Sequence, residues 1–539
     1  MNSECLPFNS IPHVSRLFTD FLYDYPRVQS FYRRSPNITA WLQEEASSIR
    51  YTAHRRQAVS GILERQNQSW GASAETLANI ARLRAGAAAV VTGQQVGLFG
   101  GPLFSLYKAL TAIKLADVAS RMGVDCVPIF WLATEDHDVA EINRVSIPGP
   151  DGSLETLAAA VAGPPDAPVG MLKFGAEMGT LVERAAGWLG ESNATQALQN
   201  SYRPGETFGS AFARLFASLF AEWGVVLVDA SDAELHHIAQ PLYRQALERN
   251  RELQDALQTR GQELEAAGYH QQVKVTPSST LLFVLRNGRR VPLHGSSEGT
   301  SRGSFTIGHE QIQPVELAAE IASSPQHFSG NVLLRPVVED FLLPTLAYTG
   351  GAAEVAYFAQ ASVVYEKLLG RTTPIVPRFS ATIVEPKAKR LLDHYGFDLA
   401  ELFQSPEQLR EALAARVLPR DLQSAFDHAE VSLKNSLEAI RNALTRLDKT
   451  LVDAADHAGA KVRHQLDGLR ARAARAELRQ TEVLSRHGEL LSHALYPNRT
   501  LQERELAGIY FLARYGKELL GAFYDVMQSD CLDHQVLSL

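Results

Sequence analysis

Residues 87–102 read AAAVVTGQQVGLFGGP, and this stretch decides the fold class. A short apolar run gives way at Thr92 to a glycine-rich loop, and residues 103–121 then carry leucines and isoleucine at helical spacing. A second apolar run, CVPIFWLA, follows at residues 126–133. The order strand, loop, helix, strand predicts a βαβ unit, and therefore a parallel sheet with both faces buried.

The same pattern recurs further along the chain. Residues 11–85 show helical periodicity, and further buried strands are predicted at 224–230, 331–336 and 344–348. Two segments of different texture interrupt the pattern. Residues 146–200 are rich in proline and glycine and then helical, and residues 272–308 contain two strand-like runs around Asn287-Gly288, a hairpin signal. We interpret both segments as insertions into an α/β core.

The last third of the chain is helical in pattern and predicts a coiled coil. Its hydrophobic residues alternate spacings of four and three over about three heptads, at Leu433, Leu437, Ile440, Leu444, Leu447, Leu451, Ala454 and Ala458. The phase slips at Val462 and resumes through Leu466, Leu469 and Ala473. As one helix, residues 431–481 would reach about 75 Å. Such a seam must pair with another helix of this chain or of a second chain; the alternative is a long amphipathic helix packed on its own core.

Composition places the chain among ordered cytoplasmic proteins. It has 539 residues, 45% of them hydrophobic, and a formal net charge of −8, so it has ample apolar material to bury and no overall basic character. This charge argues against nucleic-acid and polybasic membrane partners. Its three cysteines form no CxxC pair, no apolar run reaches the length of a membrane helix, and the first residues show no signal-peptide pattern.

The glycine-rich loop is the first candidate binding site, because ligands bind beyond the carboxyl ends of strands in open α/β sheets. Glycines let the backbone approach a ligand closely, amide side chains can hydrogen-bond it, and the N-terminus of the next helix attracts anions. The residues concerned are Thr92, Gly93, Gln94, Gln95, Gly97, Gly100, Gly101 and Lys108. The spacing fits neither a Walker A motif nor a GxGxxG fingerprint. The alternative is a tight helix entry in which the glycines serve packing.

The second candidate follows the next strand and should therefore face the same crevice. It comprises Glu135, Asp136, His137 and Asp138, with Asn143 just beyond. Carboxylates can hold Mg²⁺ beside a nucleotide or bind an ammonium group, and a histidine can transfer protons near neutral pH. A zinc site is not expected, because one histidine without a spaced partner does not make the usual ligand set. The alternative is capping of the next helix.

A third candidate lies at the second glycine-led helix start. Gly350, Gly351 and Glu354 follow the strand predicted at 344–348, and Arg335 lies just upstream. An arginine at a strand end can bind a carboxylate or phosphate. The alternatives are helix packing for the glycines and an ion pair with Glu339 or Asp340 for the arginine.

These motifs together resemble the cysteine-adding enzymes of bacillithiol biosynthesis, the bacillithiol synthase or cysteine ligase family. The resemblance also covers the length and the late coiled coil. It rests on VVTGQQVGLFGGP at 90–102, FWLATEDHD at 130–138, Glu141-Ile142-Asn143, LRP at 334–336, GGAAE at 350–354 and LQER at 501–504.

The resemblance implies a Rossmann-like parallel-sheet core with connecting-peptide insertions and an α-helical coiled-coil domain that makes a homodimer. On this basis we expect core segments at 1–145, 201–271 and 309–385, insertions at 146–200 and 272–308, a coiled-coil domain at 386–495 and a return to the core at 496–539. It also implies that L-cysteine is joined to the amino group of glucosaminyl-malate in the last step of bacillithiol synthesis.

Forming an amide in water requires activation of the carboxylate, for which ATP with Mg²⁺ as its counter-ion is the expected agent; no tightly bound protein metal is expected. Both an acyl-adenylate and an acyl-phosphate stay open, since the synthetase signatures HIGH and KMSKS are absent. The attacking amine must be neutral, so His137 or Asp136 is the expected base. The rival readings are another ATP-dependent ligase or nucleotidyltransferase, a non-catalytic dimeric scaffold, and a metal-dependent hydrolase built on residues 135–138.

Overall fold

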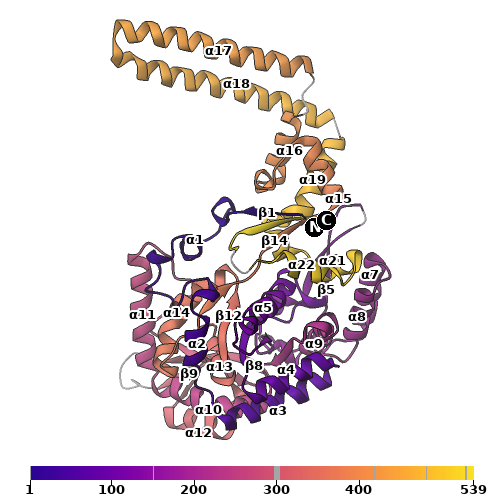
Figure 1. Ribbon diagram of the computed structural model, residues 1–539, viewed down its shortest axis with the longest axis vertical. Helices are drawn as coiled ribbons and strands as arrows, with labels where there is room; N and C mark the ends of the chain where they lie inside the picture. Colours follow the sequence, from indigo (N-terminus) through magenta and orange to yellow (C-terminus); the bar gives the residue numbers. More distant parts are fainter. Residues whose placement is uncertain (1, 150, 296–303, 417–419, 481, 529–530) are drawn as a thin grey trace.

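The computed structural model describes residues 2–149, 151–295, 304–416, 420–480, 482–528 and 531–539 (Figure 1). Its centre is a five-stranded sheet in the order β13-β12-β2-β3-β6, in which every strand pairing is parallel. The strands are β2 (Ala88–Gln94), β3 (Cys126–Leu132), β6 (Val226–Asp229), β12 (Thr345–Gly350) and β13 (Ile375–Pro377). Helix α5 (Phe104–Arg121) joins β2 to β3, so the predicted βαβ unit is confirmed.

The two faces of this sheet are covered by different hydrophobic clusters. Every residue of β3 is buried, as expected for a parallel strand with helices on both sides. Side chains alternate between the faces. Ala89 and Val91 of β2 pack into the cluster beneath the N-terminal helices, whereas Val90 packs against α5 on the other face.

Helices surround the sheet. The N-terminal ones are α1 (Arg16–Tyr23), α2 (Leu42–Ser48), α3 (Ala53–Ser69) and α4 (Ala74–Ala85). The others of the core are α9 (Phe208–Leu219), α10 (Ala233–Glu248), α11 (Asn250–Ala266), α12 (Pro314–Ser323), α13 (Arg335–Leu342) and α14 (Ala352–Leu369).

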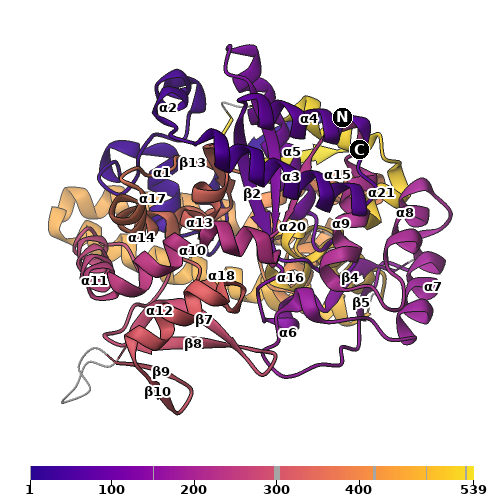
Figure 2. The same ribbon diagram turned by 90° about the horizontal axis from the view of Figure 1, so that it is seen from below.

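Two antiparallel units lie beside the core (Figure 2). The first contains α6 (Val139–Ile142), β4 (Arg144–Pro148), β5 (Leu154–Ala158), α7 (Glu177–Leu189) and α8 (Asn193–Ser201). The second is a sheet in the order β10-β9-β8-β7-β11, formed by β7 (Ser279–Arg286), β8 (Arg289–Gly295), β9 (Phe305–Ile307), β10 (Glu310–Ile312) and β11 (Phe328–Gly330).

The predicted hairpin is present in this second sheet. Asn287 and Gly288 have φ values of 52° and 75°, the left-handed conformation that a tight two-residue turn requires. Residues 296–303 of the predicted 272–308 insertion lie outside the described residues.

The strand predicted at residues 331–336 is wrong. Asn331 Oδ1 accepts hydrogen bonds from the backbone N–H of Leu333 (2.9 Å) and Leu334 (3.1 Å), which closes a turn. Pro336 then occupies the first turn of α13, where its missing N–H costs nothing. The apolar run therefore enters a helix, and Arg335 is the first residue of that helix.

The two chain ends meet in a three-stranded sheet, β1-β15-β14 (Figure 1). Its strands are β1 (Asn2–Leu6), β14 (Ala381–Val384) and β15 (His534–Ser538). Around it lie α15 (Pro386–Tyr395), α16 (Pro406–Arg416), α19 (Glu482–Leu495), α20 (Gln502–Glu505), α21 (Gly508–Tyr515) and α22 (Leu519–Val526).

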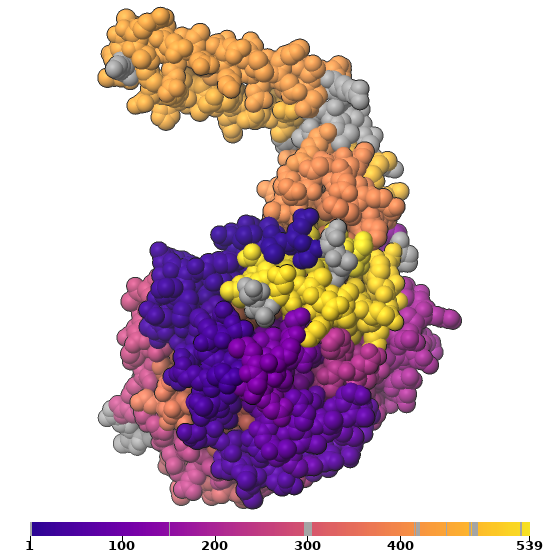
Figure 3. Space-filling view, in the orientation of Figure 1, coloured from indigo at the N-terminus to yellow at the C-terminus, as the bar shows by residue number. Residues whose placement is uncertain are grey.

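The coiled coil is an antiparallel hairpin of α17 (Arg420–Leu447) and α18 (Val452–Gln480), which projects from the rest of the molecule as an arm (Figures 1 and 3). A single rod over 431–481 is therefore wrong. Asp448 Oδ1 accepts from both the backbone N–H and the hydroxyl of Thr450 at 2.8 Å and turns the chain. Ion pairs such as Arg441–Asp456 (3.4 Å) join the two helices. Leu433, Leu437 and Leu444 of the predicted seam are half-buried, whereas Ile440, Leu447 and Leu451 remain exposed, so the hairpin covers only part of the seam.

No helix in the described part of the chain combines the length and the apolar character needed to cross a bilayer.

Candidate active site

The carboxyl ends of β2, β3 and β12 open into a cavity of about 610 Å³, where strand-end placement predicts a site. Strands β7 and β8 supply the opposite wall. Of the residues proposed from the sequence, those that line the cavity are Gly93, Gln94, Gln95, Lys108, Glu135, Asp136, Arg335, Gly351 and Glu354. The three sequence motifs thus meet in one place.

Lys108 ties the glycine-rich loop to helix α14. Its Nζ lies 2.6 Å from the Gly93 carbonyl, 3.0 Å from Gln94 Oε1 and 2.7 Å from Glu354 Oε2. Burial lowers the pKa of this amine to about 8. Glu354 also accepts from the Gly351 N–H and the Tyr348 hydroxyl, each at 2.7 Å, and so caps the helix. The contacts hold a cation and a carboxylate fixed at the cavity wall.

Gln95 joins the loop to the acidic segment. Its amide Nε2 donates to Asp136 Oδ2 (2.8 Å) and to Glu141 Oε2 (2.7 Å). Burial alone would raise the pKa of Asp136, but the hydrogen bond from Gln95 and the charge of Arg290 outweigh it, and the pKa is lowered. Asp136 is therefore a stable anion facing the cavity.

Glu135 has the opposite environment. It is half-buried, its Oε1 lies 3.2 Å from His236 Nε2, and the other ring nitrogen of His236 lies 3.1 Å from the Tyr243 hydroxyl. Burial raises the pKa of Glu135 to about 8 and lowers that of His236 to about 4. At neutral pH the carboxyl therefore holds a proton and the imidazole is neutral, so the two form a proton-sharing pair.

Arg290 reaches the cavity from β8. Its Nη2 donates to the Gly330 carbonyl (2.8 Å), its Nε to Ser329 Oγ (3.0 Å), and its guanidinium lies 3.9 Å from the ring centroid of Phe283. His137 Nδ1 lies 3.1 Å from Arg290 Nη1. These contacts fix the guanidinium beside Asp136.

Other lining residues escaped the sequence reasoning. Two of them are Arg378 and Arg504, which lie in segments distant from the three motifs. Arg378 pairs with Glu503 at 2.6 Å. Arg504 is the last residue of the LQER run that contributed to the family resemblance. Trp131 also faces the cavity, and its buried indole N–H has no acceptor among the described residues. Only the placement of Trp131 at a strand end signalled its role. Arg290 had no signal beyond the hairpin itself.

Eight proposed residues do not line the cavity, and their roles at the site stay predictions. They are Thr92, Gly97, Gly100, Gly101, His137, Asp138, Asn143 and Gly350. Thr92 Oγ1 donates to the Thr349 carbonyl (2.9 Å), and Gly100, with φ 87°, donates its N–H to the Tyr202 hydroxyl (3.0 Å). Asp138 Oδ1 caps α6 by accepting from the Glu141 N–H (3.2 Å). These three contacts match the packing and capping alternatives.

Two family models match the chain over nearly its whole length. Residues 1–379 match "Bacillithiol biosynthesis BshC, N-terminal Rossmann-like domain", and residues 381–539 match "Bacillithiol biosynthesis BshC, C-terminal coiled-coil domain". The chain belongs to the BshC family. The family resemblance inferred from the motifs and the Rossmann-like fold with its coiled coil are thereby confirmed.

Curated relatives agree with this assignment. The chain is 46% identical to a protein of Koribacter versatilis named "Putative cysteine ligase BshC", over all of both chains. Relatives with the same name from Solibacter usitatus and Salinibacter ruber are 34% and 31% identical; the alignments cover 100% of both chains in the first case, and 97% of this chain and 96% of the relative in the second. BshC proteins are named as ligases, and this chain is an enzyme of that family.

Proposed function

We propose that this protein joins the carboxyl group of L-cysteine to the amino group of glucosaminyl-malate, the last step of bacillithiol synthesis. The observation that carries the proposal is the pairing, in one cavity, of a half-buried carboxyl suited to proton transfer with several fixed cations. A cytoplasmic location is part of the proposal, because the free thiol of the substrate requires a reducing compartment.

The charge of the cavity suits an acceptor that carries several negative groups. Among the described residues, six basic side chains line it: Lys108, Lys274, Arg290, Arg335, Arg378 and Arg504. Four acids face them, Glu135, Asp136, Glu141 and Glu354, and the first is protonated at neutral pH. The surplus of positive charge favours malate carboxylates and phosphate groups.

The amine of the acceptor must lose a proton before it attacks. Asp136, a stable anion at the cavity wall, can bind the ammonium form. The ionised fraction of Glu135, which is the minority at neutral pH and grows as the pH approaches 8, can then accept the proton. A base whose pKa lies near the working pH transfers protons efficiently. His236, at 3.2 Å, keeps the carboxyl oriented while its charge changes.

The same residues fit ATP as the activating agent. Arg335 and Arg378 are buried or nearly so, and Arg335 Nη2 is already oriented by the Tyr357 hydroxyl at 2.7 Å, so both present fixed donors to phosphate oxygens. When bound, ATP with Mg²⁺ supplies the leaving group that makes a carboxyl reactive toward an amine. The unpartnered Trp131 N–H is a further donor for a bound ligand.

Reconstitution tests the proposal. Purified protein is mixed with L-cysteine, glucosaminyl-malate and ATP, and the products are analysed by mass spectrometry. We expect the amide product, with ADP or AMP indicating whether the activated carboxyl was a phosphate or an adenylate. Folded protein that binds all three molecules and makes no amide would contradict the proposal, as would equal turnover of an unrelated amine.

We also propose that the arm of α17 and α18 makes a homodimer. The coiled-coil domain of the family is compatible with such assembly. Several large apolar side chains of the hairpin remain exposed to solvent in the single chain. Burial of these side chains against a second copy would supply the driving force.

A further inference from the structure

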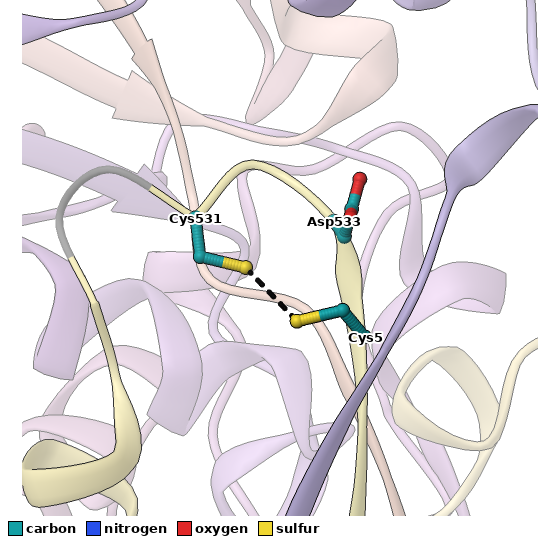
Figure 4. A group of neighbouring side chains, drawn as sticks. All are labelled: Cys5, Cys531 and Asp533. Carbon is teal, nitrogen blue, oxygen red and sulfur yellow. Dashed lines mark hydrogen bonds between the residues drawn. The ribbon is translucent and has the colours of Figure 1, made fainter.

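Two cysteines from opposite ends of the chain lie side by side. Cys5 lies on β1, which pairs with β15 in antiparallel fashion, and Cys531 lies three residues before β15 begins. The Sγ atoms of the two cysteines are 3.4 Å apart (Figure 4). Asp533 lies next to them (Figure 4). The spacing along the sequence gave no hint of this meeting.

These three side chains offer a set of metal ligands. One donor atom from each lies within 4.8 Å of the other two, and within the described residues no other group of three histidine, cysteine or acidic residues meets this condition. Cys5 is exposed and the other two are half-buried, so an ion and a water molecule can reach them. We propose that Cys5, Cys531 and Asp533 bind a thiophilic divalent cation of the Zn²⁺ type, with water as the fourth ligand.

The carboxylate is already held in place. The Tyr23 hydroxyl donates to Asp533 Oδ1 at 2.6 Å, and the same hydroxyl accepts from the Phe8 N–H at 2.9 Å. Hydrogen bonds of this kind orient the ligands of protein metal sites and leave the second carboxylate oxygen free for the ion. A disulfide would need neither the carboxylate nor its support.

Binding requires only an exchange of protons. Each sulfur–metal bond forms as an S–H bond breaks, and two protons pass to water with no change of oxidation state.

The bound ion would tie both chain ends to the cavity. His534, next to Asp533, lies 2.7 Å from Ser380 Oγ, which donates to Glu503 at 2.9 Å. Glu503 in turn pairs with Arg378, which lines the cavity. The proposed ion would thus stabilise the segment that supports Arg378. Binding of the ion does not depend on the proposed ligase reaction.

Titration of the full-length, untagged protein with Zn²⁺ and Co²⁺ tests the inference. Phosphine reductant replaces thiol reductants, and L-cysteine is omitted, because free thiols compete for the ion. We expect one ion per chain, release of about two protons per ion, a thiolate-to-cobalt charge-transfer band and a rise in Tm on Zn²⁺ addition.

Variants separate the ligands from their surroundings. Cys5→Ser and Cys531→Ser should abolish the cobalt band, and Tyr23→Phe should weaken affinity about tenfold by freeing the carboxylate. Ser3→Ala is the matched control, since Ser3 lies on the same strand and bonds Gln535 across the same pair at 2.9 Å; it should bind the ion like the wild type. Circular dichroism verifies that each variant is folded.

Three results would overturn the inference: no stoichiometric ion in the reduced wild type, undiminished binding in the folded Cys5→Ser/Cys531→Ser double variant, or a Cys5–Cys531 disulfide as the sole product of the pair with no ion bound by the reduced form.

Discussion

At the scale of single residues, the environment of Glu135 separates it from its neighbour Asp136. The two carboxyls are adjacent in the sequence, yet burial raises the pKa of Glu135 to about 8, whereas hydrogen bonds to Asp136 outweigh burial and lower its pKa. Paired carboxyls with pKa values moved in opposite directions are typical of acid–base sites. We therefore assign binding of the ammonium group to Asp136 and proton transfer to Glu135.

Glu135→Gln should lower kcat about 10²- to 10⁴-fold, the usual contribution of a positioned general base. Because Glu135 must be ionised to accept a proton, wild-type kcat/KM should rise with pH up to about 8 and then level off. The variant should lose this rise. Asp138→Asn, three residues away and outside the cavity lining, is the control and should retain the wild-type pH profile. A flat wild-type profile between pH 6 and pH 9 would exclude Glu135 as the base.

The same substitution should stabilise the fold. A carboxyl whose pKa is raised in the folded state binds its proton more tightly there, so its contribution to stability is present below the unfolded pKa, near 4.5, and is lost as pH rises to about 8. Glutamine carries no charge and can still donate to His236. The free energy of unfolding of Glu135→Gln should therefore exceed that of the wild type by a margin that widens from pH 5 to pH 8, at most about 1.4 kcal/mol per pH unit, and its Tm should be higher accordingly. A margin independent of pH would show that the carboxyl is not held neutral.

At the scale of elements, the hairpin of β7 and β8 decides which arginine enters the cavity. The turn at Asn287-Gly288 fixes the register, and successive side chains of a strand point to opposite faces. Arg290 therefore faces the cavity, whereas Arg289 pairs with Asp166 at 2.7 Å on the exposed side.

Arg290→Met should lower kcat/KM for the anionic acceptor about 10- to 100-fold, because the loss of a hydrogen bond from a charged group costs about 1.5–3 kcal/mol. Steady-state kinetics with varied acceptor concentration measure the loss. Arg289→Met removes an arginine from the adjacent position and should change kcat/KM by less than about twofold. Equal losses in the two variants would indicate damage to the hairpin as a whole and contradict a role for Arg290 in binding.

The sequence predicts the features that depend on residues close together in the chain, and it misses those that depend on contacts between distant segments. The βαβ unit, the hairpin turn and the placement of the glycine-rich loop and the acidic segment at one sheet edge depend on local pattern and on a general rule for parallel sheets. The contact of Arg290 with Gly330 depends on how an insertion packs, which no local pattern encodes.

The two wrong predictions share a cause. Both rest on apolar periodicity, which a neighbouring polar side chain overrides in each case. The side chain of Asn331 closes a turn ahead of α13, and that of Asp448 ends α17. Asparagine and aspartate side chains compete with regular structure for backbone N–H groups. An Asn or Asp next to an apolar run is therefore a sequence signal for a turn or a helix end.

At the scale of the whole molecule, the cavity and the arm are separate. None of the described residues that line the cavity lies on α17 or α18. The arm projects away from the core (Figure 3). Its large apolar side chains that remain exposed are Val431, Ile440, Leu447, Leu451, Val462 and Leu469. An exposed apolar surface of this kind favours association with a partner.

The double variant Ile440→Asp/Val462→Asp should therefore convert a dimer into a monomer while leaving kcat unchanged, because charge is costly in an apolar interface and the arm does not line the cavity. Sedimentation velocity gives the mass, and the amide assay gives kcat. Asn435→Asp/Gln465→Glu adds the same charge at exposed polar positions of the arm without removing apolar surface, and should remain dimeric. A monomeric wild-type protein would contradict the proposed dimer interface on the arm. A monomeric double variant that is folded but inactive would mean instead that the second chain completes the site.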